Sequence, residues 1–192
     1  MSYLFFRALL RFMYRILFRL EARGIEHIPE TGPVIIASNH ISNLDPPTVG
    51  VFVKRKVHFM AKEELFKVPV LGRLIQSFGA FPVKRGGVSK DAIKTAIALV
   101  KSGNMMGIFP EGTRNSSSGM AKKGAAMIAM RSGAVIVPTA IVGDYKLFRK
   151  TYVYYGEPIN LQESVDENAE DVLEAVTEVI MSRIKELIKQ HQ

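Results

Sequence analysis

The sequence predicts a single α/β domain with a mixed, mostly parallel central sheet flanked by helices, preceded by an N-terminal amphipathic helix. A chain of 192 residues, of which 47% are hydrophobic and 23% charged, can bury one compact core. Short apolar runs alternate with helical segments along most of the chain, as in sheets whose strands are connected by helices. The first 20 residues differ, because they combine apolar side chains with arginines and contain no acid. We therefore divide the chain into a helix over 1–21 and a domain over 22–192.

The N-terminal segment carries Arg7, Arg11, Arg15 and Arg19, one every four residues, among Leu, Phe, Tyr, Met and Ile. Helical spacing gathers the arginines into one stripe and leaves a broad apolar face. A transmembrane span is disfavoured because two arginines would lie near the bilayer centre, and the arginines also interrupt the apolar run of a secretory signal. We expect a helix lying in the membrane interface, with its arginines at anionic headgroups. The alternative is a core helix that caps the domain.

The first half of the domain alternates apolar runs with short helical segments. Two adjacent prolines, Pro46 and Pro47, open one of the predicted helices, since proline is favoured in the first helical turn. Alternation and β-branched residues predict the strands between them. The predicted elements are strands over 23–29 and 33–39, a helix over 46–53, a strand over 57–61, a helix over 68–78 and a strand over 79–83.

The second half begins with the clearest helix, over 89–103, which has Ser89 as a candidate N-cap and Gly103 just past its end. Residues 115–124 are predicted to be a flexible loop because of their serines and glycines. The other predicted elements are a buried strand over 105–110, a small-residue helix over 123–133, a strand over 134–142, an edge strand over 151–158 and an amphipathic helix over 166–190.

Composition and charge narrow the classes of function. The absence of cysteine excludes disulfides, thiolate nucleophiles and cysteine-bound zinc. The formal charge of +8 indicates an anionic partner. The clearest basic cluster lies within the apolar N-terminal segment and not among exposed aromatics, so we expect no nucleic acid. We also expect no metal, because the histidines show no ligand-like spacing.

His40 and Asp45 lie five residues apart in the segment NHISNLDP, directly after the strand over 33–39. On a continuous helix their side chains would point about 140° apart, so a contact between them requires a turn, which the intervening serine and asparagine favour. Such a contact would let Nδ1–H of His40 donate to the carboxylate and leave Nε2 as an acceptor, the tautomer of a general base. The alternative is a turn histidine followed by Asp45 as a simple helix N-cap before Pro46.

Two further loops carry basic residues at the ends of predicted strands. FPEGTRN places Glu111, Gly112, Thr113 and Arg114 after the strand over 105–110. VKRGG places Lys84 and Arg85 after the strand over 79–83. A guanidinium is a planar donor suited to phosphate, and glycine allows close backbone approach. Together with the histidine, these loops predict a phosphate-bearing substrate, although each charge alone is also typical of a solvated turn.

These motifs resemble those of the glycerophospholipid acyltransferase family, which includes 1-acyl-glycerol-3-phosphate acyltransferase. NHISNLDP resembles the family's NHx4D signature, GAFPVKR its second block, FPEGTR its third and VIVP its fourth, in the family's order from Asn39 to Pro138. The domain also has the size of the small bacterial members. Lys84 departs from the family, which often has an acidic residue before the arginine.

The resemblance implies acyl transfer from a thioester, acyl-coenzyme A or acyl carrier protein, to the 2-hydroxyl of 1-acyl-glycerol-3-phosphate, giving phosphatidic acid without a cofactor. His40 would be the general base and Asp45 would orient it. The substrate-binding residues would be Arg85, Glu111, Gly112, Thr113 and Arg114. The two arginines would hold the acceptor phosphate, and Glu111 would either contact the glycerol or fix an arginine.

Because these substrates partition into membranes, the N-terminal helix would seat the enzyme as a peripheral or monotopic protein on the cytoplasmic face of the cell membrane. Two alternatives remain open. One is an acyltransferase or transacylase for another lysolipid. The other is a non-enzymatic adaptor that binds anionic membranes, which explains the charge and the helix but gives no reason for His40 and Asp45.

Overall fold

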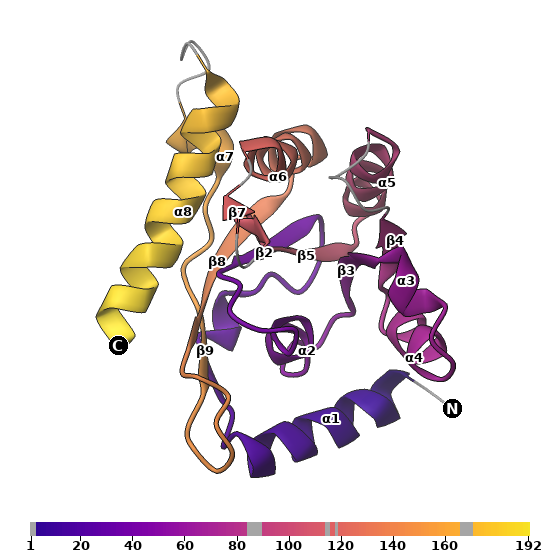
Figure 1. Cartoon of the computed structure of the whole chain (residues 1–192). Helices are drawn as coiled ribbons and strands as arrows, with labels where there is room; N and C mark the ends of the chain where they lie inside the picture. Colours follow the sequence, from indigo (N-terminus) through magenta and orange to yellow (C-terminus); the bar gives the residue numbers. More distant parts are fainter. Residues whose placement is uncertain (1–2, 84–89, 114–115, 118, 166–170) are drawn as a thin grey trace.

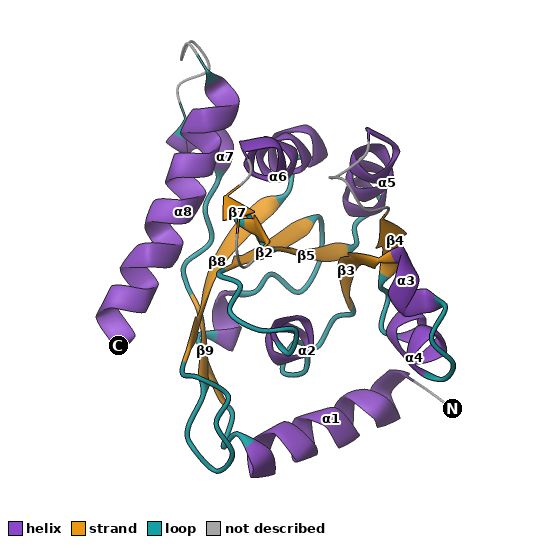
Figure 2. Cartoon of the chain, in the orientation of Figure 1, coloured by secondary structure: helices purple, strands orange, loops and turns teal. Residues whose placement is uncertain are grey.

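A computed structural model describes residues 3–83, 90–113, 116–117, 119–165 and 171–192 (Figure 1). Its centre is a seven-stranded sheet with the order β1-β9-β8-β2-β5-β3-β4, in which every neighbouring pair is parallel except β8 and β9 (Figure 2). The strands are β1 (Glu21–Arg23), β2 (Val34–Ser38), β3 (Val57–Lys62), β4 (Phe81–Val83), β5 (Met105–Ile108), β8 (Val135–Val142) and β9 (Tyr152–Tyr155). A separate antiparallel pair consists of β6 (Gly112–Thr113) and β7 (Ser116–Ser117). The predicted mixed, mostly parallel sheet in a single α/β domain is confirmed.

Helices cover both faces of the sheet. They are α1 (Tyr3–Leu17), α2 (Asp45–Gly50), α3 (Glu63–Phe66), α4 (Leu71–Ser77), α5 (Lys90–Lys101), α6 (Gly119–Ser132), α7 (Leu161–Ser164) and α8 (Val172–His191), with a 3₁₀ turn over Ile25–His27. The Asp171 side chain caps α8 by accepting from the Glu174 amide at 3.1 Å.

Strand β2 separates two apolar cores. Val34 and Ile36 pack with residues of α2 and of the α1 end, whereas Ile35 and Ala37 pack with α5, α6 and α8 on the opposite face (Figure 1). Side chains of a strand alternate between its two faces, so an unbroken apolar run serves both cores. Burying each large aliphatic side chain stabilises the fold by about 1.5–3 kcal/mol. The centre of the sheet is therefore a rigid support for the loops that leave its strands.

Helix α1 lies along one side of the domain with one face buried and the other exposed. Tyr14 is buried and packs edge-to-face on Phe18. Arg7 donates from Nη1 to the carbonyl oxygens of Val53 and Lys54, at 2.6 and 2.8 Å. The helix is thus amphipathic as predicted, but Arg7 binds the protein's own backbone instead of facing outward. Within the described part of the chain, no helix combines the length and hydropathy needed to cross a bilayer.

Three local predictions are wrong. The strand predicted over 23–29 is interrupted at Gly24, whose φ of 74° leads into the 3₁₀ turn. The strand predicted as an edge over 151–158 is internal, because β1 pairs with β9 in parallel. The loop predicted over 115–124 is helical from Gly119 onward. The predicted cap Ser89 and the predicted start of the last helix, over 166–170, lie outside the described residues.

Candidate active site

The candidate site lies at the carboxyl ends of β2 and β5, which are neighbouring strands in the centre of the sheet. His40 follows β2 by two residues, and Phe109 directly follows β5. Because the two strands are parallel and pair Ala37 with Ile108, their exit loops emerge together. The His40 imidazole stacks on the Phe109 ring with 4.3 Å between centroids and 19° between planes. The aromatic ring therefore fixes one face of the imidazole.

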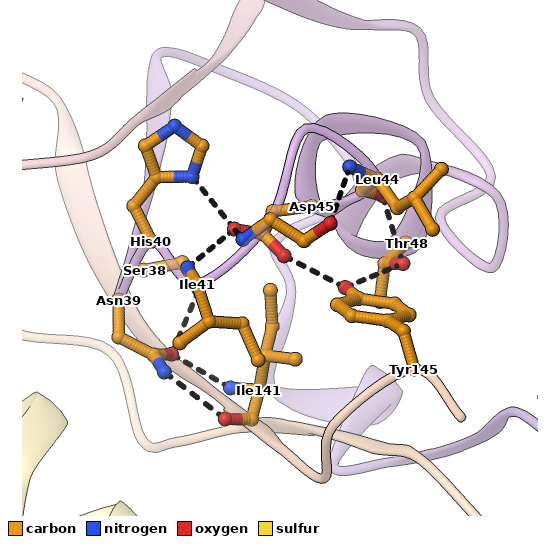
Figure 3. A network of polar contacts seen from close by, with 10 residues as sticks. Ser38, Asn39, His40, Ile41, Leu44, Asp45, Thr48, Ile141 and Tyr145 are labelled. Carbon is orange, nitrogen blue, oxygen red and sulfur yellow. Dashed lines mark hydrogen bonds and ion pairs between the residues drawn. The ribbon is translucent and has the colours of Figure 1, made fainter. Parts of the chain in front are cut away.

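Asp45 fixes the imidazole through its Nδ1 atom. The distance from His40 Nδ1 to Asp45 Oδ2 is 2.6 Å, and the same oxygen accepts from the amides of Ile41 and Ser42, both at 2.7 Å (Figure 3). These bonds close the loop into the turn that a His40–Asp45 contact requires. Asp45 is the first residue of α2, and the helix N-cap is Leu44 without a side-chain cap bond. The alternative in which Asp45 only caps the helix is therefore wrong.

A tyrosine from a distant loop completes the set of donors around Asp45. The Tyr145 hydroxyl donates to Asp45 Oδ1 at 2.8 Å and lies 2.9 Å from Thr48 Oγ1 (Figure 3). Asp45 is completely buried, with 0% of its surface exposed, so each of its oxygens needs protein donors to compensate for the loss of water. Sequence reasoning missed Tyr145, because it lies 100 residues away in a loop without a local motif.

Burial and the Asp45 carboxylate raise the pKa of Tyr145 above its ordinary value of 10.0. Burial and the same carboxylate also raise the pKa of Tyr14, in α1. Both phenols therefore stay protonated through neutral and mildly alkaline pH, so that Tyr145 remains a hydrogen-bond donor to Asp45.

The first residue of the motif, Asn39, has a structural role. Its side chain donates from Nδ2 to the Ile141 carbonyl oxygen at 3.0 Å and accepts from the Ile141 amide at 2.8 Å. This pair continues the bonding between β2 and β8 one residue beyond the end of β2. It ties the start of the loop that carries His40 to β8, the longest strand of the sheet.

The predicted substrate-binding residues are only partly within the described chain. Glu111 is described and half-buried, and Gly112 and Thr113 form strand β6 opposite β7. Arg85 and Arg114, and the family departure at Lys84, lie outside the described residues. Phe109 and Glu111 follow β5 by one and three residues. Glu111 therefore leaves the sheet at the carboxyl end of β5, the end at which His40 leaves β2.

One nitrogen of the His40 imidazole, Nε2, is available to accept a proton. With Asp45 accepting from Nδ1–H, the second nitrogen, Nε2, has a lone pair, and within the described residues no hydrogen bond engages it. The His40 side chain is 16% exposed, so the imidazole is not sealed from solvent. An imidazole held on a buried carboxylate can accept a proton from an alcohol and be stabilised as an imidazolium.

Tyr145→Phe should lower kcat about 10-fold and leave KM for both substrates unchanged, because a hydrogen bond to a charged group contributes about 1.5–3 kcal/mol and its loss leaves the carboxylate held through Oδ2 alone among the bonds described here. Steady-state kinetics on the acyl-transfer reaction would measure this split. Tyr145 is a positioning residue, since it touches Asp45 and not the imidazole.

Tyr155→Phe is the matched control, because the buried Tyr155 hydroxyl donates to the Val49 carbonyl oxygen at 2.7 Å, away from Asp45. Both substitutions should lower the melting temperature, and only Tyr145→Phe should lower kcat. Equal kinetics for the two variants would contradict a positioning role for Tyr145.

Comparison with known proteins shows the family to which this chain belongs. The acyltransferase family model matches residues 19–142. A 1-acyl-sn-glycerol-3-phosphate acyltransferase of Bacillus subtilis is 37% identical over 168 residues, which cover 84% of this chain and 84% of that protein. A chloroplastic relative of the same activity, from Brassica napus, is 33% identical over 68% of this chain, which spans only 39% of that longer protein.

A solved structure gives the same fold. The crystal structure of the 1-acyl-sn-glycerophosphate acyltransferase of Thermotoga maritima superposes with a TM-score of 0.75, covering 97% of this chain and 78% of that one, at 24% sequence identity. The fold match extends beyond the family-matched segment and includes the helices on both faces of the sheet. The family match over most of the domain and the identity to the Bacillus protein show that this chain is an enzyme of the acyltransferase family.

Proposed function

We propose that the enzyme transfers a fatty acyl group from an acyl thioester to the 2-hydroxyl of 1-acyl-glycerol-3-phosphate and so makes phosphatidic acid. The observation that carries this proposal is the His40–Asp45 pair, held at the carboxyl edge of the sheet in a member of the acyltransferase family. The activity named for the relatives from Bacillus and Brassica supplies the acceptor.

In the proposed reaction, Nε2 of His40 takes the proton of the acceptor hydroxyl as its oxygen attacks the thioester carbonyl. The new C–O bond forms, the C–S bond breaks, and the proton passes from the imidazolium to the departing sulfur. Asp45 stabilises the imidazolium between these steps. No acyl-enzyme is needed, because the chain has no cysteine and no G-x-S-x-G serine. The reaction uses no cofactor beyond the thioester co-substrate.

The acceptor phosphate would be bound by Arg85 and Arg114, whose guanidinium groups match phosphate in shape and charge. Gly112 and Thr113 would allow the backbone to approach the headgroup. Glu111 would contact the glycerol or orient one of the arginines. These roles come from the family resemblance and from the position of the two loops at strand ends.

Helix α1 would bind the enzyme to the membrane by lying in the membrane–water interface on the cytoplasmic face. Its exposed side chains include Leu4, Phe5, Leu9, Phe12 and Ile16. A helix in this position spares the enzyme from extracting its lipid substrates from the bilayer. The remaining arginines and the charge of +8 would favour anionic headgroups.

The test is acyl transfer by the intact protein to radiolabelled lysophosphatidic acid in bilayers, with acyl-coenzyme A and acyl carrier protein thioesters as alternative donors. We expect phosphatidic acid with at least one donor, and a much lower rate with monoacylglycerol, which lacks the phosphate. Acylation of lysophosphatidylcholine at an equal rate would assign another lysolipid. Vesicle binding without acyl transfer from either donor would favour the adaptor.

A further inference from the structure

The loop over residues 143–151, which connects β8 and β9, turns two large apolar side chains toward solvent. Leu147 is 62% exposed and Phe148 is 65% exposed. An exposed aromatic beside an exposed leucine at a loop tip costs hydration free energy unless a partner covers both. The loop therefore has an outward face that the fold of the chain leaves uncovered.

The backbone of this loop is held in an unfavourable conformation that displays the pair. Tyr145 and Phe148 both have positive φ, of 52° and 61°, which aromatic residues rarely adopt. The conformation is fixed by bonds to the end of α1: the Phe148 amide donates to the Leu17 carbonyl oxygen at 2.6 Å, and the Thr151 amide to that of Phe18 at 3.0 Å. Strain retained at an exposed apolar tip indicates a functional contact.

The loop continues the exposed apolar face of α1. These bonds put Leu147 and Phe148 at the carboxyl end of the helix, and Figure 1 shows the loop and α1 together at the lower border of the molecule. The exposed large apolar residues of the helix are Leu4, Phe5, Leu9, Phe12, Met13 and Ile16. We call the six helix residues and the loop pair the apolar border.

Positive charge accompanies the apolar border. Lys146, Arg149 and Lys150 flank the loop pair in the sequence. Lys146 pairs with Asp144, the one acid of the loop, at 2.6 Å and Lys150 pairs with Glu21 at 3.2 Å, so these three cations and two acids leave one net positive charge beside the loop pair. The helix segment has arginines and no acid. An apolar centre flanked by cations complements an anionic lipid surface, whose acyl region receives the apolar groups while its headgroups receive the charges.

We propose that the 143–151 loop is a second lipid-inserting element, which enters an anionic bilayer with Leu147 and Phe148 beside α1. The inference builds on the proposed interfacial position of α1 and extends it to a part of the chain more than 120 residues away in sequence. It is independent of the acyl donor and the acceptor.

The same loop reaches the catalytic pair from its inner side. Tyr145, three residues before Phe148, packs edge-to-face on Phe18 and donates to Asp45. One short loop thus links the lipid-facing tip to the buried carboxylate that holds His40. Insertion of the tip would bring the reactive edge of the sheet to headgroup depth, where a lysolipid presents its hydroxyl.

The chain contains no tryptophan, so one introduced tryptophan reports on one position. The test uses three single-tryptophan variants of the full chain. Phe148→Trp probes the loop and Phe12→Trp probes α1, where Phe12 is 62% exposed. Met130→Trp is the control, because Met130 is 40% exposed on α6, on the opposite side of the molecule (Figure 1). Fluorescence is recorded with vesicles of phosphatidylglycerol and phosphatidylcholine, with and without brominated acyl chains.

With these vesicles, Phe148→Trp and Phe12→Trp should shift to shorter wavelength and be quenched by brominated chains, whereas Met130→Trp should do neither. A response of Phe12→Trp without one of Phe148→Trp would overturn the loop proposal and leave α1 docking intact. If neither Phe148→Trp nor Phe12→Trp changes its fluorescence with vesicles, both the loop proposal and the docking of α1 are overturned. A blue shift of Phe148→Trp that grows with protein concentration without vesicles would assign the border to self-association instead.

A second measurement does not depend on a probe. Leu147→Ser with Phe148→Ser should weaken vesicle partitioning about 10- to 100-fold, as expected for withdrawing two apolar side chains that are partly inserted. Met130→Ser should leave it unchanged. Acyl transfer to substrate presented in detergent micelles then tests the proposed function separately, because it remains measurable when vesicle binding is lost.

Discussion

Replacing His40 with alanine should lower the acyl-transfer rate by about 10²–10⁴-fold, the usual contribution of a positioned general base. The physical reason is that the proposed mechanism uses Nε2 of His40 to take the hydroxyl proton, and alanine supplies no acceptor. The fold should survive, because Asp45 keeps three of its donors: the amides of Ile41 and Ser42 and the Tyr145 hydroxyl. The measurement is single-turnover formation of phosphatidic acid, together with a melting curve.

Two variants sharpen this result. His40→Gln can still donate an amide hydrogen toward Asp45 but offers no base, so it should be as slow as His40→Ala. His191→Ala makes the same chemical change at the end of α8, where the exposed His191 ring stacks on Tyr154 at 3.8 Å, and should be fully active. Turnover by folded His40→Ala within a few-fold of the wild type would exclude the general-base mechanism.

The parts of the site that local sequence reveals are those whose contacts are local. His40 and Asp45 are five residues apart, and a turn between a strand and a helix is sufficient to bring them together. The apolar runs of β2 and β5 identify buried parallel strands, whose carboxyl ends are expected to meet. Sequence pattern and resemblance to the family agree at these positions because both depend on short segments.

Contacts between distant segments could not be predicted. Tyr145 reaches Asp45 across 100 residues, and the Asn39 side chain bonds the Ile141 backbone across 102. The position of β9 was predicted wrongly for a related reason, since β1 is too short to show any alternation. At Gly24, the φ of 74° turns the backbone out of the extended conformation, which explains why the first predicted strand stops, and the Tyr155 carbonyl oxygen leaves no room there for a Cβ. Each of these features is decided by tertiary packing.

The two-sided loop over residues 143–151 is another feature of this kind. Sequence alone shows two apolar residues among lysines and arginines, which is unremarkable in a basic protein. The structure adds the positive φ of Tyr145 and Phe148 and the bonds to the end of α1. Only these observations show that the loop continues the helix surface and, through Tyr145, contacts the Asp45 carboxylate.

Asp45→Asn should slow acyl transfer by about 10- to 100-fold, less than His40→Ala, because it removes the charge while the hydrogen bonds can be kept. Oδ2 accepts from three donors, those of His40, Ile41 and Ser42, whereas in the described part of the chain Oδ1 accepts from Tyr145. The asparagine oxygen should therefore take the Oδ2 position. Its amide then faces Tyr145, whose hydroxyl can turn its hydrogen to Thr48 Oγ1, 2.9 Å away, and accept instead.

With the asparagine in this orientation, His40 keeps its proton on Nδ1 and its free Nε2, so the loss measures the attraction between the carboxylate and the imidazolium. In the serine protease triad the corresponding change costs about 10⁴-fold, because the amide there selects the wrong imidazole tautomer. Asp45→Ala is the comparison, since it removes the acceptor of all four donors and should lower stability by several kcal/mol, at about 1–3 kcal/mol for each donor left unpaired. Comparable kinetics and melting temperatures for Asp45→Asn and the wild type would show that the carboxylate charge contributes nothing, and a 10⁴-fold loss would show that the tautomer is not preserved.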